Sequence, residues 1–118
     1  MRVEGILWVG RRTARLDAMA GFLERSLGLE RVAADEGRAL FQAVNGDLVE
    51  LYGPAEGGEE LADGPVVEFA VEDLEQARRE LAAAGVEVVA DGYTWLHVRA
   101  PDGTVVGLKS GRFSDEAG

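Results

Sequence analysis

Apolar and polar residues follow two different periods along the first third of this chain. Residues 3–9 form a short, β-prone apolar run, and the apolar side chains that follow, at positions 16, 19, 20, 23 and 27, share one helical face. This order of periods predicts a strand and then an amphipathic helix. Thr13 is the expected N-cap of that helix, and Gly28 is its expected stop.

Three short strands are predicted after this helix. They cover residues 30–34, 38–44 and 47–52, with a tight turn near residues 35–37 and the hairpin signal Asn45-Gly46 between them. Residues 53–64 then contain four glycines, one proline and four acids. Such a composition leaves almost nothing to bury, so this segment is predicted to be a linker.

The same order of elements then recurs. A strand at 66–71, a helix from about 74 to 84 and strands at 86–90, 94–99 and 104–109 repeat the first half, and residues 111–118 form a tail. The run NGDLVEL at 45–51 also returns as DGTVVGL at 102–108. Such self-similarity indicates one structural unit written twice.

The repeat predicts an α+β fold made of two tandem βαβββ modules, at residues 3–52 and 65–110, joined by the linker at 53–64. With 118 residues, the chain has the common size of one domain, and each half alone would be marginal. We expect a curved mixed sheet in each module with a helix packed behind it. The other face of each sheet is then left to line a concave ligand surface.

The composition excludes several partners. The chain has 12 Lys and Arg against 22 Asp and Glu, a net charge of −10, so it lacks the basic surface that nucleic acids and anionic membranes require. No apolar run approaches the ~20 residues of a membrane span, and the first residues do not resemble a signal peptide. A cytoplasmic location is expected. Without cysteine, there are no thiolate nucleophiles or thiolate metal ligands.

At this point the sequence resembles the vicinal oxygen chelate superfamily, which includes glyoxalase I, the bleomycin-resistance proteins and the extradiol dioxygenases. The resemblance covers about residues 5 to 109. It rests on the paired βαβββ modules, on Phe22 followed by Leu27-Gly28-Leu29, and on Pro101-Asp102-Gly103 before the final strand. It implies a concave sheet surface that holds a small molecule, often completed by a second chain. A homodimer is therefore expected.

The resemblance also locates the positions where enzymes of the superfamily hold a metal. Those positions correspond here to Trp8, Glu50, Val66 and Gly107, and only Glu50 could act as a ligand. Because a divalent transition metal needs three or four suitable ligands, we expect no metal or other cofactor. Metal-dependent glyoxalase or dioxygenase activity is then not expected. A site built from Glu50, Glu68 and His97 is the alternative.

Strand alternation selects the candidate ligand contacts. If Glu50 faces inward, so do Leu48 and Tyr52, and the same reasoning places Glu68 and Lys109 on the inner faces of their strands. The predicted ligand-binding residues are Trp8, Phe41, Leu48, Glu50, Tyr52, Glu68, Trp95, His97 and Lys109.

Each of these residues also has a structural alternative. Trp8 can simply fill the core. The two glutamates can pair internally with Lys109, Arg38 or Arg99, because buried carboxylates are seldom without partners. A lone histidine such as His97 is more often structural than catalytic.

Two functions follow from these residues. The first is a metal-independent binding protein that sequesters an aromatic or cationic small molecule in the groove of the sheet. The second is a metal-free isomerase, lyase or cyclase that uses His97 or Glu50 as its acid or base. A third possibility is a dimeric accessory or regulatory subunit.

Overall fold

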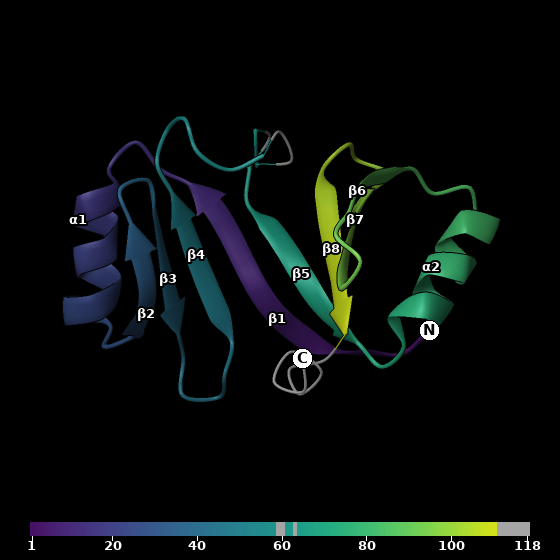
Figure 1. The fold of residues 1–118 in the computed structure, drawn as a ribbon, viewed down its shortest axis with the longest axis horizontal. Coiled ribbons are helices and arrows are strands. Elements are labelled where there is room, and N and C mark those ends of the chain that lie inside the picture. Colours follow the sequence, from purple (N-terminus) through teal and green to yellow (C-terminus); the bar gives the residue numbers. More distant parts are fainter. Residues whose placement is uncertain (59–60, 63, 111–118) are drawn as a thin grey trace. The chain divides into compact units, whose positions relative to one another are not determined.

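The computed structural model describes residues 1–58, 61–62 and 64–110, and the predicted tail at 111–118 lies outside them. Within this part, eight strands and two α-helices form a mixed α+β fold (Figure 1), which confirms the predicted fold class. The chain divides into two compact units. The first unit is Trp8–Pro65, and the second combines Met1–Leu7 with the chain from Val66 onward. Strand β1 (Val3–Arg12) therefore contributes residues to both.

The first unit contains one module of the predicted kind. Its strands follow the order β2 (Glu30–Asp35), β3 (Arg38–Gln42), β4 (Leu48–Tyr52) and β1. Strand β1 runs parallel to β4, whereas the two hairpin pairs are antiparallel, so the sheet is mixed. Helix α1 (Leu16–Gly21) covers one face of this sheet. The buried core between them consists of Ala20, Leu23, Ala39, Phe41 and Leu51.

The second unit repeats this arrangement. Its strands follow the order β5 (Val66–Val71), β8 (Val105–Ser110), β7 (Trp95–Arg99) and β6 (Val88–Asp91), with β5 parallel to β8. Helix α2 (Leu74–Ala83) begins at Asp73, whose side chain accepts a hydrogen bond of 3.0 Å from the backbone N–H of Gln76. The core under this helix consists of Val71, Leu74, Ala77, Leu96, Val98 and Leu108.

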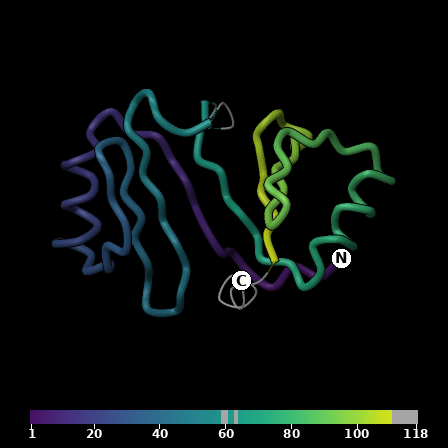
Figure 2. The backbone as a smooth tube through the Cα atoms, in the orientation of Figure 1, coloured from purple at the N-terminus to yellow at the C-terminus, as the bar shows by residue number. Residues whose placement is uncertain are grey.

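The duplication extends to individual hydrogen bonds in the turn that precedes the last strand of each module. In the first unit, Asn45 Oδ1 accepts from the N–H of Asp47, and in the second unit Asp102 Oδ1 accepts from the N–H of Thr104. The central glycine has a positive φ in both turns, +93° at Gly46 and +91° at Gly103, a conformation that glycine adopts without strain. The backbone trace in Figure 2 follows both hairpins.

The first helix differs from its prediction. It starts at Leu16 with Arg15 as N-cap, and Thr13 instead accepts a hydrogen bond from the N–H of Arg15. After Gly21 the chain continues as a π-helical turn, η1 (Phe22–Ser26), closed by a bond from the N–H of Leu27 to the carbonyl of Phe22. The wider turn rotates the residues that follow it, so Leu27 is 59% exposed instead of packing on the apolar face.

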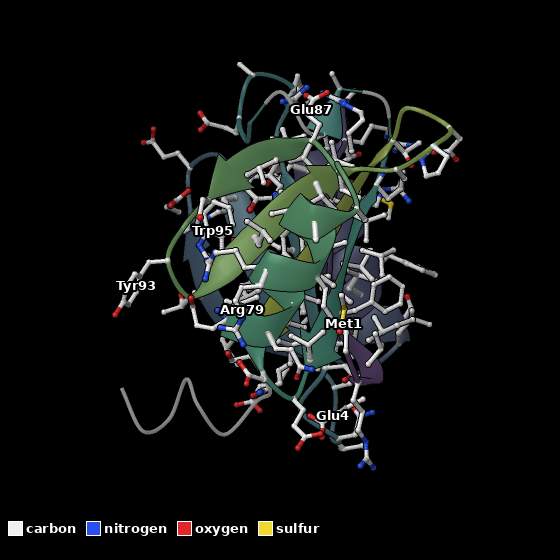
Figure 3. The ribbon with its side chains drawn as sticks, turned by 90° about the vertical axis from the view of Figure 1, so that its right-hand side faces the viewer. Met1, Glu4, Arg79, Glu87, Tyr93 and Trp95 are labelled. Carbon is white, nitrogen blue, oxygen red and sulfur yellow. The ribbon has the colours of Figure 1, made fainter. Side chains whose placement is uncertain are left out.

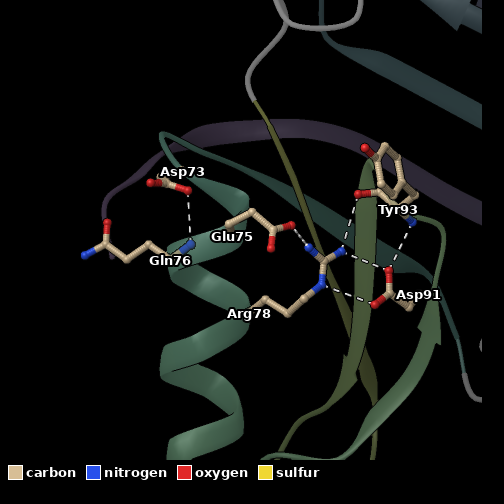
Figure 4. Close-up of polar contacts among 6 residues, drawn as sticks. All are labelled: Asp73, Glu75, Gln76, Arg78, Asp91 and Tyr93. Carbon is tan, nitrogen blue, oxygen red and sulfur yellow. Dashed lines mark hydrogen bonds and ion pairs between the residues drawn. The ribbon is translucent and has the colours of Figure 1, made fainter.

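The guanidinium group of Arg78 links helix α2 to the turn between β6 and β7 through hydrogen bonds (Figure 4). Arg78 donates from Nη2 and Nε to the two carboxylate oxygens of Asp91, at 2.9 and 3.2 Å, and also pairs with Glu75. Asp91 accepts a further bond from the N–H of Tyr93, which has a φ of +74°. The Tyr93 N–H and the Arg78 guanidinium together lower the pKa of Asp91, and Asp91 in turn raises the pKa of Arg78. Figure 3 shows the Tyr93 side chain projecting away from the ribbon.

Candidate functional site

In each unit the sheet has one face covered by a helix and one that is not, and we call the second the open face of that unit. Residues that alternate along a strand share a face. Val49 and Leu51 pack on the helix side of the first unit, so Leu48, Glu50 and Tyr52 lie on its open face. The predicted facing of this strand is thereby confirmed.

Trp8 and Glu50 meet on the open face of the first unit. The indole Nε1–H of Trp8 donates to Glu50 Oε1 at 3.0 Å, and a guanidinium nitrogen of Arg38 lies 3.3 Å from Glu50 Oε2. The carboxylate is buried, with only 8% of the residue exposed. Both of its oxygens therefore have strong donors, and the expected internal pair between Glu50 and Arg38 is present.

Gly10 makes room for the indole of Trp8. A Cβ atom at Gly10 would come within 2.2 Å of Cη2 of Trp8, so the ring lies against the backbone of its own strand. Gly10 is also the register partner of Glu50 on the adjacent strand. A glycine inside a strand often marks such a close approach.

The other predicted contacts of the first unit lie on different faces. Leu48 is the register partner of Trp8, and Tyr52 is the partner of Arg38, so both extend the open face. Phe41, by contrast, has no exposed surface and belongs to the core cluster under α1. Alternation with Leu40 places Phe41 on the opposite side of the sheet from Glu50, so Phe41 does not line the open face.

A buried acid–base pair occupies the open face of the second unit. Glu68 Oε2 and His97 Nε2 are 3.1 Å apart, and 9% and 7% of the two side chains are exposed. The pair spans three strands, because Glu68 and His97 are both register partners of Gly107 on the strand between them. A Cβ at Gly107 would lie 2.9 Å from Glu68 Cγ and 2.9 Å from His97 Cδ2. Glycine at this position therefore leaves the space that the pair fills.

Trp95 and Lys109 flank this pair on the same face. The rings of Trp95 and His97 are 4.7 Å apart between centroids and tilted by 46°, a favourable aromatic arrangement. A Cβ at Gly92 would fall within 1.8 Å of the Trp95 indole, so this ring rests on backbone, as that of Trp8 does. Lys109 is the register partner of Trp95 and brings a cation to the face.

The two units place the same two residue types on exchanged strands. In the first unit, glycine stands on β1 and glutamate on β4, at Gly10 and Glu50. In the second unit, glutamate stands on β5 and glycine on β8, at Glu68 and Gly107. Each buried carboxylate thus lies beside a glycine and accepts from an aromatic ring nitrogen. The sequence alone set Glu50 against Gly107 but did not show which ring nitrogen each carboxylate contacts.

The polar side chains on the two open faces do not fit a metal ion. Among the described residues, no group of three or more His, Cys, Asp or Glu side chains is arranged to hold an ion. Glu50 is bound by Trp8 and Arg38, and Glu68 is bound by His97, so neither carboxylate offers its full coordination capacity.

Among the residues that the structure describes, no helix is both long and apolar enough to cross a membrane.

Three residues of these faces were not among the predicted ligand contacts. Gly10 and Gly107 provide space, and Arg38 neutralises Glu50. For Gly107 the signal was present, since this glycine interrupts an otherwise apolar run, whereas Gly10 only follows the apolar run at residues 3–9. Arg38 had been considered only as one of three possible partners, because strand register decides which cation reaches which acid.

Comparison with known proteins agrees with this architecture. The family model described as Glyoxalase/Bleomycin resistance protein/Dioxygenase superfamily matches residues 5–108. No curated protein matches the chain.

Several solved structures share the fold. Methylmalonyl-CoA epimerase from Mycobacterium tuberculosis is 21% identical with a TM-score of 0.72, and the match covers 98% of this chain and 93% of that one. The Mn(II)-bound glyoxalase from Novosphingobium aromaticivorans is 24% identical with a TM-score of 0.75, covering 92% of this chain and 39% of that one. A glyoxalase/bleomycin resistance protein/dioxygenase superfamily member from Vibrio splendidus 12B01 is 17% identical with a TM-score of 0.63, covering 93% and 100%. At these identities the likeness concerns the fold alone.

Proposed function

Because this chain belongs to the Glyoxalase/Bleomycin resistance protein/Dioxygenase superfamily, we propose that it binds a small molecule on the open face of its sheets, without a metal ion. The observation that carries the proposal is the pairing, on each open face, of an indole ring with a buried carboxylate. These pairs are Trp8 with Glu50 and, by way of His97, Trp95 with Glu68.

Energetics support a binding role for these faces. A buried charge costs free energy unless it is paired, and apolar packing at the same place is often at least as stable. An indole beside such a pair offers a large flat surface for stacking.

The proposed ligand is flat and aromatic, and any cationic group on it pairs with the second unit. Glu50 already has Arg38 and the Trp8 N–H as partners, so it contributes little to the recognition of a further cation. Glu68 is paired with the neighbouring imidazole, with His97 Nε2 lying 3.1 Å from Glu68 Oε2. The net charge of −10 favours the approach of cations in general.

A ligand screen by thermal unfolding tests this proposal. A ligand that binds only the folded chain, present at 100 times its dissociation constant, should stabilise the protein by about 2.7 kcal/mol. We expect flat aromatic compounds to raise the melting temperature of the wild-type chain, and Trp95→Ala to remove most of that shift. Tyr93→Ala is the matched control, because Tyr93 is 86% exposed and lies in the turn between β6 and β7. The proposal fails if no compound of a broad aromatic and cationic panel changes the melting temperature.

We also propose that the chain acts as a cytoplasmic homodimer. Large apolar side chains are exposed in each unit, among them Val3 at 52%, Ile6 at 48% and Phe22 at 49%. Exposed apolar surface of this kind is a common feature of surfaces that bind another chain. Light scattering coupled to size-exclusion chromatography measures the mass directly, and a monomer at micromolar concentration contradicts this assembly.

A further inference from the structure

The turn between β3 and β4 contains the only asparagine of the chain, Asn45, and a glycine follows it directly. Asn45 is exposed, and Gly46 has the positive φ of +93° that this turn requires. Because glycine has no Cβ, nothing on Gly46 obstructs an attack of its backbone nitrogen on the Asn45 side chain. The residue pair that suits the turn is therefore also a pair prone to deamidation, the reaction that makes asparagine thermolabile.

The second unit has the same turn with a different pair of side chains. In both turns the N–H of the central glycine donates to a carbonyl three residues earlier, at 2.9 Å. In the first turn, Asn45 Nδ2 donates to Asp47 Oδ2 at 2.8 Å. In the second turn the direction is reversed, because Asp102 Oδ1 accepts from Thr104 Oγ1 at 2.7 Å. An amide thus faces a carboxylate in one turn, and a carboxylate faces a hydroxyl in the other.

The acid in the second turn depends on its donors. The Thr104 hydroxyl and then the Thr104 N–H lower the pKa of Asp102, so this carboxylate is well held in its charged form. The corresponding side chain of the first turn is Asp47, which accepts from Asn45 and cannot donate when it is charged. A carboxylate at position 45 would place an oxygen where Nδ2 now lies, next to Asp47 Oδ2. The first turn therefore suits the amide and not the acid.

We propose that Asn45 is a site of spontaneous deamidation, and that the carboxylate formed there weakens the β3–β4 hairpin through repulsion from Asp47. This inference goes beyond the proposed ligand binding and does not depend on it. It concerns the same module, because Arg38 on β3 and Glu50 on β4 pair across the register that this turn sets.

The proposed reaction consumes only water. The Gly46 nitrogen loses its proton to solvent and attacks Cγ of Asn45, so a carbon–nitrogen bond forms, and Nδ2 takes up a proton and leaves as ammonia. The product is a five-membered succinimide ring. Water then adds to one of the two ring carbonyl groups and breaks its bond to the nitrogen, which recovers a proton. One opening gives aspartate, and the other gives isoaspartate, whose main chain runs through the extra methylene.

The closed turn slows this reaction. The N–H of Gly46 donates to the carbonyl of Ala43 at 2.9 Å, and both polar atoms of the Asn45 side chain are hydrogen-bonded to Asp47. The attacking nitrogen and the side-chain amide must leave these partners before they meet, so conversion requires the turn to open locally. The hairpin thus delays its own modification.

Mass spectrometry of the chain during incubation at neutral pH tests the modification site. A synthetic peptide of residues 42–49 provides the rate without the fold. We expect the folded chain to convert about 10-fold more slowly than the peptide, because only the open turn reacts. Labelling with an isoaspartyl methyltransferase should detect isoaspartate in both. Asn45→Gln is the matched control, since the longer side chain would have to close a larger ring.

Two results of this experiment contradict the inference. If the folded chain contains no product at Asn45 after the peptide has reacted completely, the modification site is overturned. If the chain and the peptide convert at the same rate, the protective role of the closed turn is overturned. Conversion of the Asn45→Gln variant as fast as the wild type would place the reaction elsewhere in the chain and also overturn the site.

The Asn45→Asp variant tests the proposed repulsion, because it installs the acid with an unaltered main chain. We expect its melting temperature to fall by about 4 °C, the scale of one lost hydrogen bond in a chain of this size. In the Asp47→Thr background the same substitution copies the pair of the second unit and should cost clearly less. Equal cost in the two backgrounds, or no cost in the first, overturns the repulsion. If Asn45→Asp does not fold, wild-type chain deamidated by incubation and separated by charge replaces it.

Discussion

At the scale of single residues, glycine decides where each buried carboxylate lies. Gly10 accommodates the Trp8 indole beside Glu50, and Gly107 accommodates Glu68 with His97. A Cβ at Gly10 would meet the Trp8 indole, and a Cβ at Gly107 would meet both Glu68 and His97. The chemistry of the open faces thus depends on two positions that carry no functional group.

Substitution of Gly107 by alanine tests this dependence. The new Cβ would lie 2.9 Å from both Glu68 Cγ and His97 Cδ2, so we expect a loss of about 1–3 kcal/mol in the free energy of unfolding, as in other overpacked sites. Urea denaturation measures it. In the His97→Ala background one of the two clashes is absent, so the same substitution should cost clearly less. An equal cost in both backgrounds contradicts the steric explanation.

The hydrogen bond from Trp8 to Glu50 makes a second prediction at this scale. Trp8→Phe keeps an aromatic ring but removes the Nε1–H donor, and hydrogen bonds to charged groups contribute about 1.5–3 kcal/mol. We expect a loss in that range by urea denaturation. Trp95→Phe is the control, because Trp95 contacts His97 through its ring. Equal losses in the two variants would show that ring size, not the donor, is responsible.

At the scale of elements, helix α2 depends on polar contacts at its N-terminus. Asp73 caps the helix by accepting from the N–H of Gln76 at 3.0 Å, so Asp73→Ala should lower stability by about 0.5–2 kcal/mol. Asp73→Ser keeps a capping oxygen and should retain most of the stability in the same thermal unfolding experiment. A similar loss in both variants would rule out the cap as the cause.

The contact between α2 and the β6–β7 turn should depend on pH. The folded chain lowers the pKa of Asp91, chiefly through the Tyr93 N–H and then through Arg78, so the stabilising contribution is present above the unfolded pKa. It is lost as the pH falls through the lowered folded value. The stability difference between the wild type and Asp91→Asn should therefore shrink on acidification from neutral pH to about pH 3. A difference that stays constant over this range contradicts the assignment.

At the scale of the whole molecule, each unit has its own apolar core, yet strand β1 belongs to both. Each unit is only about half of the chain, and a chain that short rarely stabilises a core by itself. We therefore expect one cooperative unfolding transition, with the two modules forming a single domain as the sequence predicted.

A cavity variant tests this cooperativity. Leu96 is fully buried in the second unit, and Leu96→Ala should cost about 2–5 kcal/mol. If the chain unfolds as one domain, hydrogen exchange should accelerate in the protected core amides of the first unit as well, at Phe41 and Leu51. Acceleration confined to the second unit would show that the two units unfold separately.

The sequence by itself determined the elements and their facing. Alternation placed Glu50, Leu48 and Tyr52 opposite Val49 and Leu51 because strand periodicity is a local property. The repeat predicted matching turns, and the positive φ at Gly46 and Gly103 follows from the same local constraint. Local sequence failed at Leu27, where a π-helical turn changed the helical phase.

Only the tertiary structure decided which polar groups meet. The pairs Trp8 with Glu50 and His97 with Glu68 join residues on different strands, and their contact depends on strand register and on the space left by glycine. Neither quantity is a local property of the chain. For that physical reason the sequence could nominate Glu50, Glu68 and His97 as candidates, whereas the structure showed that His97 belongs with Glu68 and that Glu50 belongs with Trp8 and Arg38.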